Sequence, residues 1–116
     1  VLIKNKKKNN IFEDLLKNFW INIDPFDANG QFCDKGYSYR SVAFYQNKNQ
    51  KNLIQAEIKN LEKKFNKKIV TYVREFKKFY RAESGHQNFY KESFQNYLRY
   101  KKGCKREEIL SKIWNR

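Results

Sequence analysis

The loop between Asp24 and Ser41 contains the side chains of this chain that are best suited to chemistry. Asp34 is followed two positions later by Gly36 and five positions later by Tyr39. A carboxylate and a phenol at this spacing, with a flexible glycine between them, can converge on one small polar group of a substrate. The phenol would donate a hydrogen bond and the carboxylate would accept one. The alternative is that Asp34 only caps a turn or bonds its own backbone, as loop aspartates commonly do.

The two cysteines have different surroundings. Cys33 has no evident helix start or basic partner to lower the pKa of its thiol, so we interpret it as a buried or incidental thiol and not as a nucleophile. Cys104 lies in a basic tail from Tyr100 to Arg106, where neighbouring cations would stabilise a thiolate. Two cysteines so far apart suggest neither a zinc cluster nor a disulfide-stapled secreted domain. No metal or cofactor is expected.

Two further polar side chains have competing interpretations. His86 either bonds neighbouring backbone or Glu83 at a helix start, or helps to shape a substrate site. Arg40, next to Tyr39, is expected on the opposite face of a strand and paired with a carboxylate. The sequence contains no glycine-rich phosphate loop and no serine-type nucleophile motif.

Hydrophobic periodicity predicts an α+β order of elements to position these residues. Apolar residues at helical spacing predict four helices: one from Ile11 to Trp20 capped by Asn10, one over 48–64, one opening at Ser84, and a short last one over 109–114. The third of these is expected to bury Tyr90, Phe94 and Tyr97. Alternating or β-branched residues predict strands over 39–46 and 69–74, with the end of another strand at 1–3.

The composition limits the function classes. The 116 residues are enough for one domain, and the net charge is +14. Because the lysines are scattered among asparagines, we favour a solvated basic surface. The alternative is a small basic nucleic-acid-binding module that stacks bases on some of the eight tyrosines and ten phenylalanines. No apolar run approaches the roughly 20 residues of a membrane span. We expect a cytoplasmic location and a monomeric state.

Two motifs in order resemble a known family. The first is Phe19-Trp20, Asp24-Pro25, Gln31, Asp34, Gly36 and Tyr39-Arg40-Ser41, and the second is Ala82-Glu83, His86-Gln87 and Tyr90. The first is similar to the central signature of peptide methionine sulfoxide reductase A, FW, DP and Q-x-x-D-x-G-x-QYRS, and the second to that family's AE-x-x-HQ-x-x-Y. Position 38 is serine where the family usually has glutamine.

The resemblance implies a single domain over 1–116, built as part of a ferredoxin-like plait with added C-terminal helices. It implies reduction of methionine S-sulfoxide, free or in proteins, with thioredoxin as reductant and a role in repair of oxidative damage. Tyr39 would donate a hydrogen bond to the sulfoxide oxygen and Asp34 would hold the substrate. Cys104 would be either a resolving cysteine or an inert surface thiol, and His86 and Glu83 would shape the site.

The main departure from the family is the missing G-C-F-W motif, which carries the nucleophilic cysteine. We therefore expect this stretch to be the later part of a reductase, inactive alone. Loss of the first strand and helix of the plait would also expose apolar surface, so low solubility or marginal stability is expected.

Overall fold

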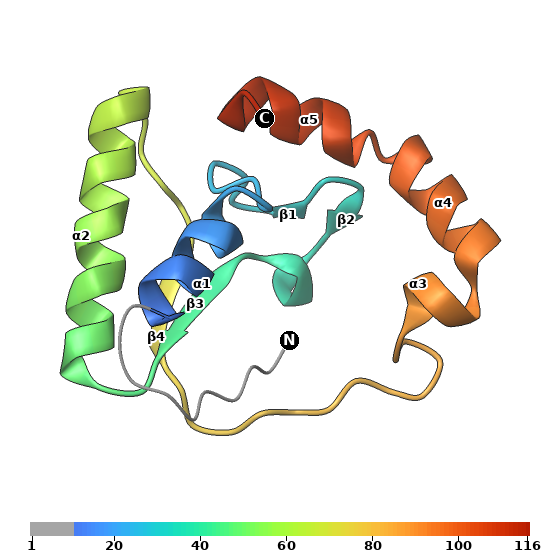
Figure 1. Ribbon diagram of the computed structural model, residues 1–116, viewed down its shortest axis with the longest axis horizontal. Coiled ribbons are helices and arrows are strands. Elements are labelled where there is room, and N and C mark those ends of the chain that lie inside the picture. The colour runs from blue at the N-terminus through green and yellow to red at the C-terminus, as the bar shows by residue number, and fades with distance from the viewer. Residues whose placement is uncertain (1–10) are drawn as a thin grey trace.

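The computed structural model describes residues 11–116. The predicted strand at 1–3, the basic run that follows it and the Asn10 cap lie outside the described residues. Within them, helices and short strands alternate and then give way to three C-terminal helices, which confirms the α+β class (Figure 1). None of the helices in this range is long and apolar enough to cross a membrane.

A small core forms where two helices pack on one strand. Helix α1 (Ile11–Trp20) buries Leu16 and Trp20, which are four positions apart and so lie on one face. They pack with Ala43, Ile54 and Ile69, from β3, from α2 and from the segment before β4, respectively. The first helix is therefore amphipathic as predicted, and its Phe19-Trp20 pair serves the core.

The centre of the fold is a βαβ unit. Strand β3 (Val42–Tyr45) pairs in parallel with β4 (Tyr72–Glu75), and helix α2 (Lys48–Phe65) connects them. The side chain of Asn47 accepts a hydrogen bond from the Gln50 amide at 2.9 Å and begins α2, and left-handed Asn66 ends it. This helix and both strands confirm the periodicity analysis, with each strand starting three residues later than predicted.

The predicted strand start at Tyr39 is wrong. Residues 37–39 form a short 3-10 helix, η1 (Tyr37–Tyr39), closed by a hydrogen bond from the Tyr39 amide to the Gly36 carbonyl at 3.1 Å. Gly36 has φ 132°, a conformation that glycine adopts without strain. The chain therefore turns before it enters β3, and Tyr39 and Arg40 do not lie on opposite faces of a strand.

The C-terminal third forms an arc of three helices around one side of the molecule (Figure 1). They are α3 (Phe89–Glu92), α4 (Phe94–Gly103) and α5 (Arg106–Trp114). The last one confirms the predicted short helix. The predicted helix start at Ser84 is wrong, because Asn88 takes a left-handed conformation and α3 begins only after it. Tyr90 and Phe94 are exposed and Tyr97 is half-buried, contrary to the predicted burial.

Candidate functional site

Asp34 is positioned by a two-stranded antiparallel hairpin, β1 (Gly30–Gln31) and β2 (Asp34–Lys35). Gly30 has φ 157°, and a Cβ at this position would lie 2.1 Å from the Asp34 carbonyl oxygen, so only glycine allows the two strands to approach this closely. The Gln31 side chain accepts a hydrogen bond from the Asp24 amide at 2.9 Å and donates one to the Asp24 carbonyl at 2.7 Å. The preceding loop is thereby fixed to the hairpin.

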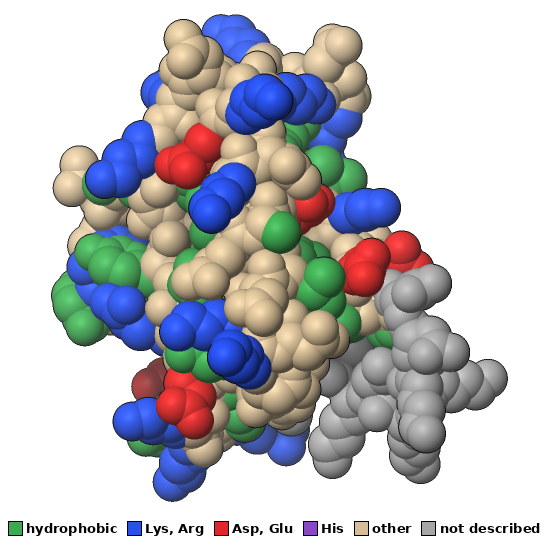
Figure 2. Space-filling model, turned by 90° about the vertical axis from the view of Figure 1, so that its left-hand side faces the viewer, with side chains coloured by type: hydrophobic (Ala, Val, Ile, Leu, Met, Phe, Trp, Pro, Cys, Tyr) green, Lys and Arg blue, Asp and Glu red, His purple; other side chains and the backbone are tan. Residues whose placement is uncertain are grey.

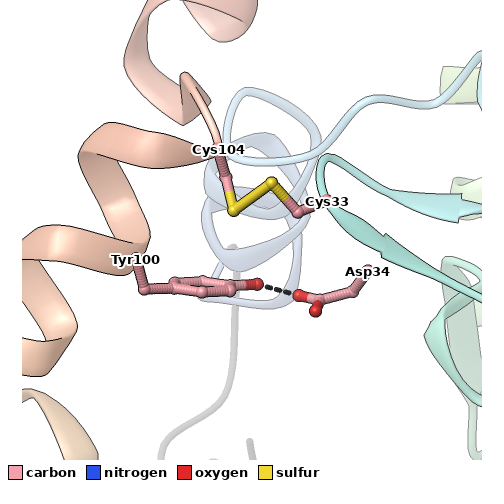
Figure 3. The surroundings of a disulfide bond; sticks show 4 residues. All are labelled: Cys33, Asp34, Tyr100 and Cys104. Carbon is pink, nitrogen blue, oxygen red and sulfur yellow. Dashed lines mark hydrogen bonds between the residues drawn. A yellow bond between two sulfur atoms is a disulfide. The ribbon is translucent and has the colours of Figure 1, made fainter.

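The hairpin is joined to the C-terminal helices at two neighbouring positions (Figure 3). Cys33 and Cys104 form a disulfide, with their Cα atoms 5.3 Å apart. The hydroxyl of Tyr100 donates a hydrogen bond to Oδ2 of Asp34. The interpretation of Cys33 as a buried or incidental thiol is therefore wrong, because Cys33 is exposed and forms a disulfide. Cys104 is not a free surface thiol either, because it is the partner in that disulfide. The Asp34 side chain bonds Tyr100 and, among the described residues, no backbone group.

Tyr39 stands at the end of η1 and is 53% exposed. Its ring lies beside Gly36, where an added Cβ would be 3.7 Å from the ring atom Cδ2. Since η1 and β2 contact each other, Asp34 and Tyr39 lie on adjoining elements. Within residues 11–116 their side chains form no hydrogen bond with each other, and Tyr39 is exposed whereas Asp34 is half-buried.

Arg40 holds the η1 turn in place. Its guanidinium carbon lies 3.7 Å from the ring centre of Tyr37 and 4.6 Å from that of Tyr72, and its Nη1 donates to the Tyr72 hydroxyl at 2.7 Å. Its Nε donates to the Tyr37 carbonyl at 3.1 Å. The predicted carboxylate partner is wrong, because in the described residues Arg40 is held between two aromatic rings. This places Tyr39 relative to β4.

Glu83 and His86 lie together in a turn that precedes α3. The His86 amide donates a hydrogen bond to the Glu83 carbonyl at 2.8 Å, within a turn and not at a helix start. Both residues are exposed, and α3 packs on α4. No hydrogen bond in the described range joins either residue to the hairpin or to η1.

Charged side chains of both signs lie next to the site. Burial raises the pKa of the Asp27 carboxyl, but hydrogen bonds from Lys35 and from the Asn29 amide outweigh it, so this pKa lies below the usual 3.8. Lys35 follows Asp34 directly, and its ion pair with Asp27 ties β2 back to the preceding loop. On the other side of the disulfide, Lys105 and Arg106 follow Cys104.

Other site types find little support in residues 11–116. No three His, Cys, Asp or Glu side chains gather there as metal ligands. Two open hollows of about 390 and 630 Å³ run along α2, and neither is lined by Asp34 or Tyr39. Figure 2 shows the face that carries α2, where Lys and Arg side chains are separated by neutral and acidic ones. This pattern favours a solvated surface over a continuous nucleic-acid-binding face.

The contact between Tyr100 and Asp34 is not predicted by the sequence. Tyr100 lies four positions before Cys104, the residue that ends α4, so the two side chains lie about one helical turn apart. Asp34 is the next residue after Cys33 in the hairpin. If the disulfide were known, these spacings would place Tyr100 opposite Asp34. The sequence offers no sign of the disulfide itself.

Comparison with known proteins gives a consistent result. The family model described as peptide methionine sulfoxide reductase matches residues 1–116. Proteins named peptide methionine sulfoxide reductase MsrA from Bacillus velezensis and Bacillus subtilis are each 44% identical over 105 residues. The one from Halalkalibacterium halodurans is 41% identical over 107 residues. The Bacillus matches cover 89% of this chain but only 59% of the relatives, and the third covers 90% and 61%.

Proposed function

The chain belongs to the peptide methionine sulfoxide reductase family, and from this premise we propose that it forms the substrate-holding part of a reductase acting on methionine S-sulfoxide. The observation that carries the proposal is the match of the family over the whole chain, together with the adjoining positions of Asp34 and Tyr39. Because the chain spans about three fifths of the length of these relatives, the activity of the complete protein is part of the proposal.

In the proposed reaction a thiolate attacks the sulfoxide sulfur. The oxygen is transferred to the attacking sulfur: a new S–O bond forms there, the S–O bond to the methionine sulfur breaks, and uptake of one proton gives a sulfenic acid and free methionine. A second thiol then displaces water from the sulfenic acid and forms a disulfide, which a dithiol reduces. Tyr39 would donate a hydrogen bond to the sulfoxide oxygen, which gains negative charge as sulfur is attacked. Asp34 would accept a hydrogen bond from the substrate, and Glu83 and His86 would shape the site.

The nucleophile is proposed to lie outside these residues. The sequence has no G-C-F-W motif, and both of its cysteines are joined in a disulfide. We propose that this stretch does not turn over by itself. Cys104 could resolve a sulfenic acid only after the bond to Cys33 is reduced. Thioredoxin as the dithiol, a monomeric state and a cytoplasmic location belong to the same proposal.

The test restores the missing part and then removes single functional groups. The chain is extended with the part of the Bacillus subtilis relative that it does not match, and reduction of free methionine S-sulfoxide is measured with dithiothreitol. Tyr39→Phe should lower kcat/KM about 100-fold, because one donor to the developing oxyanion is lost. Asp34→Asn should raise KM about tenfold.

Tyr37 is the matched control for this experiment. It stands in the same short helix and is 82% exposed, so Tyr37→Phe should change kcat/KM by less than about twofold. Unchanged turnover in both Tyr39→Phe and Asp34→Asn would refute the proposed roles. An equal loss in all three variants would indicate damage to η1 and would equally refute a specific role for Tyr39.

A further inference from the structure

Two neighbouring hairpin residues meet two residues that lie one helical turn apart. Figure 3 shows Cys33 bonded to Cys104 and, directly below, Asp34 bonded to Tyr100. The covalent bond and the hydrogen bond therefore share one short interface. The disulfide is therefore the covalent neighbour of the contact that the Asp34 carboxylate makes.

Helix α5, which follows Cys104, is anchored without help from the disulfide. Leu110 is fully buried, and Nε1 of Trp114 donates to the Ile23 carbonyl at 2.9 Å. Arg106 donates to the Asn22 carbonyl at 3.0 Å. Buried apolar area and these hydrogen bonds stabilise the position of α5 on the loop after α1.

Helices α3 and α4, which we call the arm (residues 89–103), lack such anchors. They contain no buried residue, and Phe94 and Leu98 are 53% and 41% exposed. Within the arm, the rings of Tyr90 and Tyr97 pack edge to face, with their centres 6.3 Å apart. Of the hydrogen bonds and ion pairs in residues 11–116, only the one from Tyr100 to Asp34 joins the arm to the hairpin.

We infer that the Cys33–Cys104 disulfide is a redox-controlled latch that holds the arm against Asp34. In the oxidised chain the latch keeps the Tyr100 hydroxyl on the carboxylate. In the reduced chain α5 stays docked, while the arm detaches from the hairpin and releases Asp34. The effect of the latch on catalysis rests on the proposed role of Asp34, whereas the movement of the arm does not depend on that role.

Reduction of the latch is chemically accessible from one side. Cys33 is exposed, so the thiolate of a dithiol can attack its Sγ. The bond between the two sulfurs breaks and Cys104 leaves as a thiolate, which the adjacent Lys105 and Arg106 stabilise. The second thiol of the dithiol then displaces Cys33 and closes its own disulfide. Two electrons pass from the dithiol to the chain, and the two thiol protons of the dithiol are transferred to Cys33 and Cys104.

Amide hydrogen exchange on the whole chain, with and without dithiothreitol, tests the latch. Reduction should lower the protection of amides 94–103 about tenfold or more and leave that of 106–114 unchanged. The double variant Cys33→Ser/Cys104→Ser should show the reduced pattern without reductant. Tyr100→Phe should weaken protection in the oxidised chain less than reduction does, with Tyr97→Phe as the matched control. Equal protection of the arm in both states, or a parallel loss in α5, would overturn the latch.

Binding of free methionine S-sulfoxide then separates the latch from the proposed function. If both hold, reduction should tighten binding about tenfold, because Tyr100 no longer occupies the carboxylate, and Asp34→Asn should abolish the gain. Arm movement with no change in binding would leave the latch standing and refute the proposed role of Asp34. Tighter binding on reduction without arm movement would refute the latch alone.

Discussion

Removal of the disulfide should destabilise the folded chain by about 4 kcal/mol. The bond joins residues with a sequence separation of 71. A cross-link over that distance restricts the unfolded chain strongly, and the chain-entropy relation for a loop of this size gives about 4 kcal/mol at room temperature. The native state recovers little of this, because α5 is anchored through Leu110 and Trp114 and keeps Cys104 near the hairpin.

Urea unfolding measures this loss. Trp20 is buried in the core and Trp114 lies against it, so tryptophan fluorescence reports the transition. With a slope of about 2 kcal/mol per molar urea, the midpoint of Cys33→Ser/Cys104→Ser should lie about 2 M below that of the oxidised chain. The double variant is preferred to single ones, because a remaining thiol can form bonds between molecules. The wild-type chain with reductant should match it.

A difference below about 1 kcal/mol, in a chain whose disulfide is shown intact by thiol titration, would refute this reasoning. It would mean that the unfolded chain already keeps the two cysteines close. If the double variant is unfolded in buffer, a graded ratio of reduced to oxidised dithiothreitol applied to the wild type gives the same free energy. Folding and disulfide formation are linked, so each stabilises the other equally.

Two further predictions concern the loop and the hairpin. Gly30→Ala should lower stability by more than about 1 kcal/mol in urea unfolding, because Gly30 has φ 157° and an added Cβ would meet the Asp34 carbonyl, while Gly85→Ala, with open space around it, should be near neutral. Asp27 has a pKa below 3.8, so it stabilises the fold above that pH and the contribution is lost as pH falls through its folded pKa. The urea midpoint of Asp27→Asn should thus fall less between pH 5 and pH 2 than that of the wild type. An equal fall would contradict the stabilising role of the Asp27 carboxylate. The control is Asp14→Asn, which removes an exposed carboxylate.

Elements with local signals could be predicted from the sequence. Helix α2 has a capping asparagine at its start, a left-handed Asn66 at its end and an apolar face that buries Ile54. The prediction of this helix rests on the spacing of its apolar residues, which depends only on neighbours in the chain, and this is why it is accurate. The η1 turn depends on the backbone of Gly36, whose positive φ is not visible in an alternating pattern of side chains.

Long-range contacts could not be predicted. The aromatic spacing predicts one helix that buries Tyr90, Phe94 and Tyr97, but periodicity does not say what would cover such a face. In the structure these residues lie on two helices, and Tyr90 and Phe94 are exposed. The pairing of Cys33 with Cys104 depends on where α5 docks, and the contact of Tyr100 with Asp34 follows from that pairing. One tertiary fact therefore decides the surroundings of the main candidate residue.

The two candidate residues of the site are held by different distant partners. Asp34 is held by the hairpin and by Tyr100 of α4, whereas Tyr39 is held through Arg40, which bonds Tyr72 of β4. A latch on the C-terminal side can therefore change the carboxylate without moving the phenol. Because the bond from Arg40 to Tyr72 does not involve the disulfide, reduction would change how a substrate is held and leave the proposed hydrogen-bond donor in place.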